Sequence, residues 1–394
     1  MLLYKLITTD DVIMKDVRFV QLDGLRGIAV LIVFLSHTSG RQIMLHPVFN
    51  FAGIGHVGVY LFFCLSAFLL SKKLFEENID TNSVKRFIIK RFFRIVPLYF
   101  LVIILLYVIQ NVTGYYNKDY LHISDGNVGF IQHLLFYRGD GVFWSVVVEE
   151  QFYIIVPLCI FLFIRFRYWA IIIFSFYAII NFLLYTSKSL QFPLNVDWIK
   201  YITTNYRQSG NYHDVFFCTV IFVYFFISKK MLFEKIRKKI AFLANFFFIS
   251  FLILTFCLVS KKFLFFDRPF YGFRFLSLLY SLVFSLFIVS VYFDNPINRF
   301  LKSKCLTYIG KFGFSIYLLH MAVFEFVNYI DIASPLKFML SFSLVFLVGY
   351  LGYRLIELPS IQFSHFIINK FNMNKFKMSY SSSNTSSIPE SLKN

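Results

Sequence analysis

The chain has 394 residues, of which 58% are hydrophobic and 15% charged, and its mean hydropathy is +0.67. Soluble domains of this length carry more charge and less aliphatic and aromatic bulk, so the composition excludes an ordinary soluble protein. The formal net charge of +18 would suit nucleic acid, but the basic residues lie between apolar runs, which is typical of membrane topology signals and predicts no nucleic-acid partner.

Apolar runs recur from end to end, each long enough to cross roughly 30 Å of hydrocarbon. The sequence therefore predicts an all-α, polytopic membrane protein. No small-residue cleavage site follows the first run, so we expect a retained span rather than a signal peptide. The ten expected spans are residues 22–38, 56–71, 94–112, 144–164, 168–186, 213–228, 240–260, 273–293, 306–330 and 336–356.

The distribution of basic residues predicts the orientation of these spans. With a cytoplasmic N-terminus, the inner segments carry 25 Lys and Arg residues and the outer loops carry nine, which favours N-in and C-in in the cytoplasmic (inner) membrane. We expect a cytoplasmic segment (1–21), a transmembrane domain (22–363) and a Ser-rich, disordered tail (364–394). The five cysteines show no CxxC or Cys/His spacing, so neither a metal site nor a disulfide framework is predicted.

The first span carries an arginine and a histidine within LDGLRGIAVLIVFLSH. On a helix, Arg26 and His37 lie about 20° apart around the axis and about 16 Å apart along it. Ionisable side chains at membrane depth usually face the bundle interior or a wet cavity and mark function. A snorkelling arginine and a hydrogen-bonded core histidine are the alternatives. Asp23 lies one turn before Arg26 and is expected to hold it.

A basic cluster lies at the inner end of the third span, in FIIKRFFRIVPLYF. Lys90 and Arg94 are four residues apart and share a helix face, and Arg91 can flank the same groove. Such a cluster suits an anionic ligand with several phosphates. A stop-transfer and lipid-anchoring cluster is the alternative interpretation.

Two adjacent carboxylates, Glu149 and Glu150, lie near the outer end of the fourth span, in FWSVVVEEQFYIIVPL. Because neighbouring helical residues point about 100° apart, we expect only one of them to face any given cavity. One carboxylate could hold a proton, or the two could bind a hydroxylated substrate or a cation. Trp144 and Tyr153 could instead be aromatic residues of the membrane interface.

The ninth span has a polar face formed by Tyr317 and His320, which are one helical turn apart. A structural hydrogen bond and a catalytic role are both open for His320. At the end of the tenth span, Arg354 and Glu357 have i,i+3 spacing, which favours an ordinary ion pair at a helix end.

Five motifs in this order resemble the membrane-bound acyltransferase-3 family, the O-acyltransferases of bacterial surface glycans. The resemblance covers residues 18–363. Arg26 and His37 meet the family's R/K-x10-H pattern, and GVYLFFCLSAFLL meets its second-span pattern except that Ala67 replaces the usual glycine. KRFFRIVPLY matches RRxxR with Lys90 in place of the first arginine. The fourth motif, FWSVVVEEQFYIIVP, matches its family pattern. The fifth, IGKFGFSIYLLHMAV, matches except that Phe314 is spaced differently around Ser315 and Ala322 stands where proline is common.

The resemblance implies a donor and an acceptor. The donor would be cytoplasmic acetyl-CoA, with no metal involved, and its phosphates would be held by Lys90, Arg91 and Arg94. The acceptor would be a sugar hydroxyl on the outer side, on a lipid-linked or nascent glycan such as O-antigen or exopolysaccharide. Acetyl transfer to that hydroxyl is therefore the expected activity.

The same resemblance implies roles for the remaining motif residues. His37 would act as a general base or carry the acetyl group, and Arg26 would polarise the acyl carbonyl. Glu149 or Glu150 would orient the histidine or bind the acceptor. Supporting roles are expected for Asp23, Ser66, Trp144, Ser145, Tyr153, Tyr317 and His320.

Two other functions compete with acyl transfer. A proton-coupled carrier of a glycan or small molecule would use the buried Arg, His and Glu as a relay. A glycan polymerase or ligase would need a large outer loop rich in arginine, and the outer loops here are modest and poor in basic residues. The motif order favours the acyltransferase.

Overall fold

The computed structural model describes residues 19–77, 79–114, 123–189, 212–259, 276–293 and 295–385, and within these ranges it contains helices and no strand. The all-α prediction is thus confirmed for this part of the chain. The elements are α2 Val20–Gly40, α3 Gly55–Glu76, α4 Thr81–Thr113, α5 Gly126–Leu134, η1 Gly141–Phe143, α6 Trp144–Arg165, α7 Arg167–Ser189, α9 His213–Ser228, α10 Lys230–Lys235, α11 Arg237–Val259, α12 Leu276–Tyr292, α13 Asn298–Leu301, α14 Lys304–Lys311, α15 Gly313–Asn328, α16 Ser334–Gly352, the π-helical η2 Tyr353–Glu357 and α17 Leu358–Thr385.

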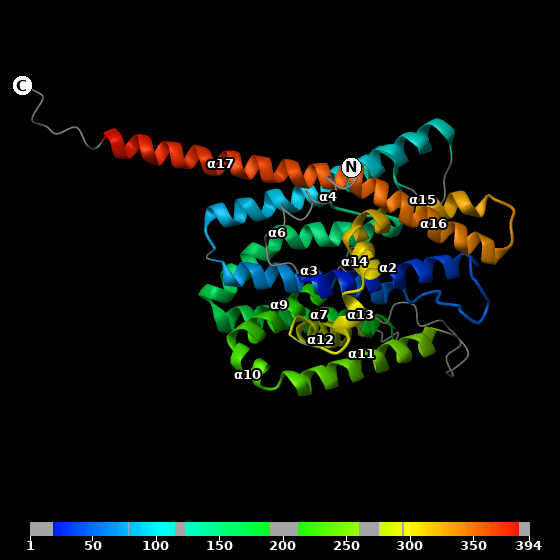
Figure 1. Cartoon of the computed structure of the whole chain (residues 1–394), viewed down its shortest axis with the longest axis horizontal. Helices are drawn as coiled ribbons and strands as arrows, with labels where there is room; N and C mark the ends of the chain where they lie inside the picture. The colour runs from blue at the N-terminus through cyan, green and yellow to red at the C-terminus, as the bar shows by residue number, and fades with distance from the viewer. Residues whose placement is uncertain are drawn as a thin grey trace, which may run out of the picture.

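The long helices form a bundle with α2 and α3 near its middle (Figure 1). α2 packs against α3, and α3 also packs against α9 and α12. α15 pairs with α16, and α17 packs along α4 before it extends beyond the bundle. The helices α2, α3, α4, α6 and α15, which carry the sequence motifs, therefore lie close to one another.

By length and composition, five of the described helices can cross a membrane, or six if one bent pair counts as a single span. Three further apolar helices are shorter, at residues 167–180, 213–228 and 277–292. The chain is thus a multi-pass membrane protein. Within the described residues, each of the ten expected spans overlaps a helix or a helix pair, but the number ten and the N-in, C-in orientation stay predictions.

The ninth expected span, residues 306–330, is corrected from one helix to a bent pair. α14 ends at Lys311, α15 begins at Gly313, and the two helices are bent by 77°. The physical reason is that the two halves have different neighbours, because α14 packs on α2 whereas α15 packs on α16. Apolar composition alone does not reveal such a change of partner.

The end of the chain also differs from the expected tail. α16 continues through the π-helical segment into α17, so residues 364–385, expected as part of a disordered tail, are helical. No glycine or proline interrupts the stretch between Pro359 and Pro389, which removes the strongest local signals for ending a helix. Residues 386–394, like the N-terminal residues 1–18, lie outside the described ranges.

Two glycines allow the segment α13–α14 to lie directly on α2. A Cβ atom at Gly24 would be 1.8 Å from the carbonyl oxygen of Leu301, and one at Gly27 would be 2.3 Å from that of Leu306. Only glycine permits backbones to approach this closely. These two positions flank Arg26, so the crossing fixes the place of that arginine in the bundle.

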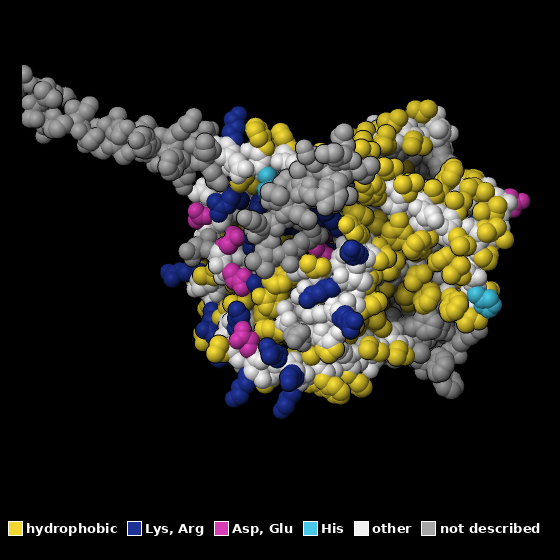
Figure 2. Space-filling view, viewed as in Figure 1, with side chains coloured by type: hydrophobic (Ala, Val, Ile, Leu, Met, Phe, Trp, Pro, Cys, Tyr) yellow, Lys and Arg dark blue, Asp and Glu magenta, His cyan; other side chains and the backbone are white. Residues whose placement is uncertain are grey.

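Charged side chains gather at one end of the molecule. Figure 2 shows Lys and Arg on the side where α3 ends, α4 begins and α10 lies, whereas the opposite part of this face is mostly hydrophobic. This is the end that the sequence assigns to the cytoplasm. Large apolar side chains are also exposed along the sides of the helices, for example Ile154 and Leu158 on α6, as expected for surfaces that face lipid.

Candidate active site

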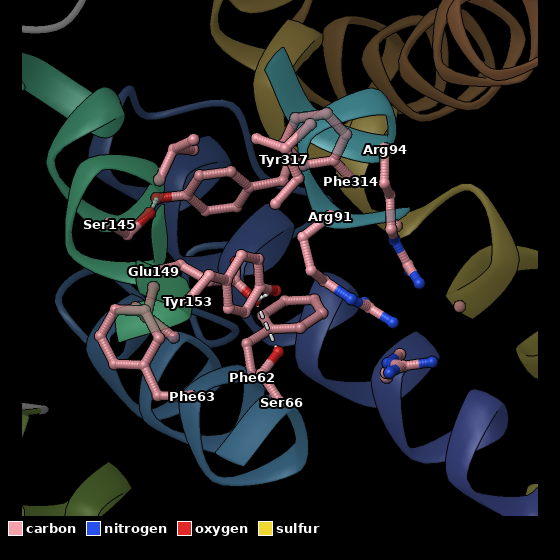
Figure 3. A pocket seen from close by; sticks show the side chains of 16 residues that line it. Phe62, Phe63, Ser66, Arg91, Arg94, Ser145, Glu149, Tyr153, Phe314 and Tyr317 are labelled. Carbon is pink, nitrogen blue, oxygen red and sulfur yellow. Dashed lines mark hydrogen bonds between the residues drawn. The ribbon is translucent and has the colours of Figure 1, made fainter. Parts of the chain in front are cut away.

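A central pocket of about 670 Å³, open mouth included, lies between α2, α3, α4, α6 and α15. Figure 3 shows its side chains, with the guanidinium groups of Arg91 and Arg94 on one side and Ser145 and Tyr317 on the other. The pocket thus joins residues from all five sequence motifs. Its polar lining consists of Arg26, Ser66, Arg91, Arg94, Ser145, Glu149, Tyr153 and Tyr317.

Glu149 is the carboxylate of the central pocket. Its Oε1 atom accepts a hydrogen bond of 2.5 Å from the Ser66 hydroxyl and another from the Tyr153 hydroxyl. Two donors on one oxygen fix the carboxylate at the junction of α3 and α6. Tyr153 is buried, so it is a pocket residue rather than part of an interfacial belt.

Glu150 points away from the central pocket. It is 7% exposed, does not line the pocket, and its Oε1 atom has no hydrogen-bond partner among the described residues. The expectation that only one of the two carboxylates faces a given cavity is confirmed. Of the two carboxylates, Glu149 is therefore the one that lines this pocket.

Three arginines form the cationic side of the pocket. Arg26 on α2 is held by a 3.0 Å ion pair with Asp23, as the sequence predicts. Arg91 and Arg94 reach the pocket from α4, and the Nε atom of Arg91 is buried with no hydrogen-bond partner among the described residues. A cluster of guanidinium groups of this kind suits phosphate or carboxylate.

Lys90 does not join these arginines. It lines a neighbouring hollow of about 440 Å³ with Lys73 and Arg86, whereas Arg91 lines both spaces. The prediction that Lys90 and Arg94 face the same groove is therefore wrong, because they line different spaces. Residues four apart share a helix face, but on α4 the face between Arg91 and Arg94 points into the pocket.

The amino-terminal end of α4 is fixed by a capping box. The Asp80 carboxylate accepts a 2.7 Å hydrogen bond from the Ser83 backbone N–H, and the Ser83 hydroxyl is 2.9 Å from the Asp80 backbone N–H, which donates to it. These bonds satisfy two backbone groups that have no partner within the helix. The cap thus sets where the helix that carries Arg91 and Arg94 begins.

A wider space, here called the vestibule, opens on the charged end of the molecule. It has a volume of about 1460 Å³, open mouth included. Four residues, Arg26, Ser66, Arg91 and Arg94, line both the vestibule and the central pocket, so the two spaces adjoin. The vestibule's charged lining also includes Asp23, Lys72, Lys73, Glu76 and Glu77.

Tyr317 and Ser145 form the wall opposite the arginines. The Ser145 hydroxyl donates to the Tyr317 oxygen at 2.7 Å, and the Tyr317 hydroxyl donates to the carbonyl oxygen of Val142 at 2.9 Å. Both side chains are largely buried. This hydrogen-bonded pair ties α15 to the start of α6 and fixes the far end of the pocket.

His37 does not line the central pocket with Arg26. Its ring lies 5.2 Å from that of His320, which in turn lies 5.6 Å from the ring of Tyr317 (centroid distances). A chain of ring contacts thus leads from the pocket wall to His37. Arg26 and His37 lie eleven residues apart on α2, so they are at different depths, and only Arg26 lines the pocket.

Trp144 belongs to an aromatic cluster beside the pocket. Its ring stacks on His56 at 6.1 Å and lies 4.4 Å from the ring of Tyr212, while the pocket residue Phe63 meets it edge-on at 6.0 Å. Trp144 is half-buried. It therefore supports the pocket wall through Phe63 rather than lining the pocket itself.

Glu357 is a buried carboxylate beside Arg94, although its i,i+3 spacing from Arg354 favours an ordinary helix-end pair. Glu357 is 1% exposed, accepts a 2.7 Å hydrogen bond from Ser315, and lies near enough to Arg94 for their charges to interact. The π-helical segment that ends at Glu357 shifts the helical register. The only sequence signal is a carboxylate inside an apolar run, in RLIELPS.

The pocket combines a fixed carboxylate, hydroxyl groups and a cluster of arginines. Such a site can bind an anionic ligand at the arginines and polarise or deprotonate a group placed near the hydroxyls. Among the described residues, no group of three or more His, Cys, Asp or Glu side chains is placed to hold a metal ion.

Comparison with known proteins gives the family. The sequence profile of the acyltransferase-3 family, which describes an acyltransferase domain, matches residues 19–354. A Staphylococcus aureus (strain COL) protein is 27% identical over 376 residues, which cover 88% of this chain and 58% of that protein. An S. aureus (strain NCTC 8325 / PS 47) protein named O-acetyltransferase OatA is 25% identical over 360 residues, or 86% of this chain and 56% of the relative.

A third relative is named for its substrate. The peptidoglycan O-acetyltransferase OatA of Listeria monocytogenes is 29% identical over 163 residues, covering 36% of this chain and 24% of that protein. The two S. aureus relatives match most of this chain, but the chain spans only about half the length of each of them. No solved structure matches it. Because the domain profile covers most of its residues, the chain belongs to the acyltransferase-3 family of transferase enzymes.

Proposed function

We propose that the chain is an integral membrane O-acetyltransferase. It transfers an acetyl group from cytoplasmic acetyl-CoA to a sugar hydroxyl of a cell-surface or lipid-linked glycan. The observation that carries this proposal is the central pocket, which places Arg26, Arg91 and Arg94 opposite the hydrogen-bonded Glu149 and adjoins the vestibule at the basic end. The names of the relatives support O-acetyl transfer as the reaction.

The arginines carry the argument for the donor. A coenzyme A thioester has a bulky end with several phosphates and a thin arm that ends at sulfur. In the proposal, the phosphates contact Arg91 and Arg94 where the vestibule meets the central pocket, and the arm reaches toward Tyr317. The Arg91 Nε atom, buried without a hydrogen-bond partner among the described residues, supports such a ligand.

The chemistry requires a base on the acceptor side. The sugar oxygen forms a bond to the acyl carbonyl carbon as the carbon–sulfur bond breaks, the hydroxyl proton passes to His37, and the thiolate takes up a proton and leaves as a thiol. In the second route, the His37 nitrogen first forms a bond to the acyl carbon as the carbon–sulfur bond breaks and the thiolate takes up a proton. The sugar oxygen then forms its bond to the acyl carbon as the carbon–nitrogen bond breaks, and the hydroxyl proton passes to the released His37 nitrogen. Both routes use the lone pair of one His37 nitrogen.

The proposal includes a location and an orientation. The protein would lie in the cytoplasmic membrane with ten spans and with both termini on the cytoplasmic side, as the positive-inside rule predicts. The vestibule then opens on the donor's compartment, because it lies at the end rich in Lys and Arg. The acceptor glycan approaches from the opposite side, where α2 ends with His37 in its last turn.

Mass spectrometry of surface glycans tests the proposal. Cells that contain the protein should carry one extra acetyl mass on a particular sugar, and cells that lack it or contain His37→Ala at normal protein levels should not. The exposed serine variant Ser343→Ala is the control and should acetylate normally. Identical glycan masses with and without the protein would contradict the proposal.

A second measurement separates transfer from transport. Acetyl-CoA should protect Arg91 and Arg94 from an arginine-specific reagent if these residues hold the donor. A carrier that uses the buried charges only as a proton relay would show no protection. The same membranes can be used for both measurements, so protein amount is controlled.

A further inference from the structure

His320 is a second histidine of the acyl-transfer region, and its ring has a defined hydrogen-bonding state. It lies on α15, is 2% exposed, and its Nδ1 atom is 2.5 Å from the carbonyl oxygen of Tyr317. A carbonyl oxygen can only accept a hydrogen bond, so Nδ1 must carry the hydrogen. In the neutral ring, Nε2 therefore presents a lone pair.

The Nε2 atom of His320 is buried and has no hydrogen-bond partner among the described residues. A buried polar atom without a partner is uncommon in folded proteins and calls for an explanation. The ring of His37 lies 5.2 Å away between centroids, at an angle of 50°. At this separation, two imidazole nitrogens that turn toward each other come within hydrogen-bonding distance.

We infer that His320 is a positioning residue for His37. Its Nε2 atom accepts a hydrogen bond from one ring N–H of His37, and this fixes the tautomer in which the other His37 nitrogen carries the lone pair used in the reaction. In hydrolytic triads, a third group orients the catalytic histidine in the same way. The inference rests on the role proposed for His37, because it concerns the nitrogen that takes the hydroxyl proton or the acyl group.

The surrounding contacts hold the two helices in the required register. Arg41, just after α2, forms a 3.8 Å ion pair with Glu325 of α15, and its Nη1 atom lies 3.7 Å from the sulfur of Met321. These contacts join the end of α2 to α15 within about one turn of the histidines. A small rotation of either ring is then enough to form the bond, since apo sites often have longer hydrogen bonds that tighten with substrate.

Two substitutions at His320 test this inference. His320→Leu removes the acceptor, whereas His320→Gln can place an amide oxygen near the position of Nε2. We expect the leucine variant to lower kcat about a hundredfold with an unchanged KM for the donor, and the glutamine variant to recover at least about a tenth of the wild-type kcat. His46→Leu, an exposed histidine, is the matched control and should retain wild-type kcat.

Nitrogen chemical shifts of isotope-labelled histidine provide a readout that a purely structural role would not change. In the wild-type protein and in His320→Gln, His37 should show one tautomer, and in His320→Leu it should show a mixture. A folded His320→Leu protein with wild-type kcat or with a single His37 tautomer would overturn the inference. If the wild-type protein transfers no acetyl group, the proposed function fails, whereas the tautomer of His37 still tests the hydrogen bond.

Discussion

The Ser66 hydroxyl donates a 2.5 Å hydrogen bond to the Oε1 atom of Glu149 and so joins α3 to α6 inside the central pocket. Removing this donor in Ser66→Ala should lower the rate of acyl transfer about tenfold, because a hydrogen bond to a charged group is worth about 1.5–3 kcal/mol. Glu149→Gln should lower it further, since it removes the charge as well. Steady-state rates in membranes of equal protein content measure both effects.

Ser343→Ala is the matched control for this pair. Ser343 is exposed and donates to the carbonyl oxygen of Met339 within its own helix, so the same substitution there should leave the rate within about twofold of wild type. Equal losses in Ser66→Ala and Ser343→Ala would show that the Glu149 contact has no part in the reaction.

The arginines and Lys90 should differ in their effect on the donor. Arg91→Ala and Arg94→Ala should each raise the KM for acetyl-CoA about tenfold or more, because each removes a cation that lines both the central pocket and the vestibule. Lys90→Ala should raise KM less than either arginine variant, since Lys90 lines the neighbouring hollow and neither the central pocket nor the vestibule. If KM rises most in Lys90→Ala, Lys90 contacts the phosphates of the donor, as the sequence predicts.

The glycines beside Arg26 should be sensitive to a single methyl group. Gly24→Ala would place a Cβ atom 1.8 Å from a backbone oxygen, and Gly27→Ala would place one at 2.3 Å. We therefore expect each variant to lower the free energy of unfolding by at least about 1–3 kcal/mol. The melting temperature in detergent measures this loss. Gly40→Ala in the same helix meets nothing within 4 Å and is the control; a similar loss there would contradict the packing argument.

The cap of α4 should respond to pH. The hydrogen bonds from the Ser83 backbone N–H and hydroxyl lower the pKa of Asp80 below its usual value. The carboxylate therefore stabilises the helix above the ordinary aspartate pKa of about 4, and this contribution is lost as the pH falls through the lowered value. Asp80→Ala should lack it at every pH.

Hydrogen exchange of the first turn of α4 measures this effect. At neutral pH the turn should exchange faster in Asp80→Ala than in the wild type, and at strongly acidic pH the two should become alike. Asp80→Asn, which keeps an oxygen acceptor without a titrating group, should protect the turn across the range. Faster exchange in Asp80→Asn than in Asp80→Ala would contradict the capping role.

Much of the pocket could be predicted from local patterns. Arg26, Arg91, Arg94 and Glu149 are recognisable as charged groups in or beside apolar helices, and the family resemblance adds Ser66. The structure brings all five to one pocket. A 100° turn between neighbouring residues was enough to predict that one of the two adjacent carboxylates faces elsewhere. These predictions succeed because each depends only on the geometry of a single helix.

The remaining features depend on how helices meet, which a single sequence does not encode directly. The bend between α14 and α15 arises because the two helices have different partners. The inward position of Glu357 depends on a π-helical segment, and the separation of Lys90 from Arg94 depends on which face of α4 meets the pocket. The contact of His37 with His320 likewise joins two helices far apart in sequence.

The central claim is that an acetyl group passes from the basic end of the molecule to a sugar on the other side. Purified protein in sealed vesicles, with isotope-labelled acetyl-CoA on one face and a glycan acceptor on the other, measures this directly. We predict that label enters the acceptor only when the donor faces the vestibule, and that Arg94→Ala and His37→Ala abolish or strongly reduce the transfer. Label in the acceptor when the donor faces the opposite end, or undiminished transfer by both variants, would contradict the account.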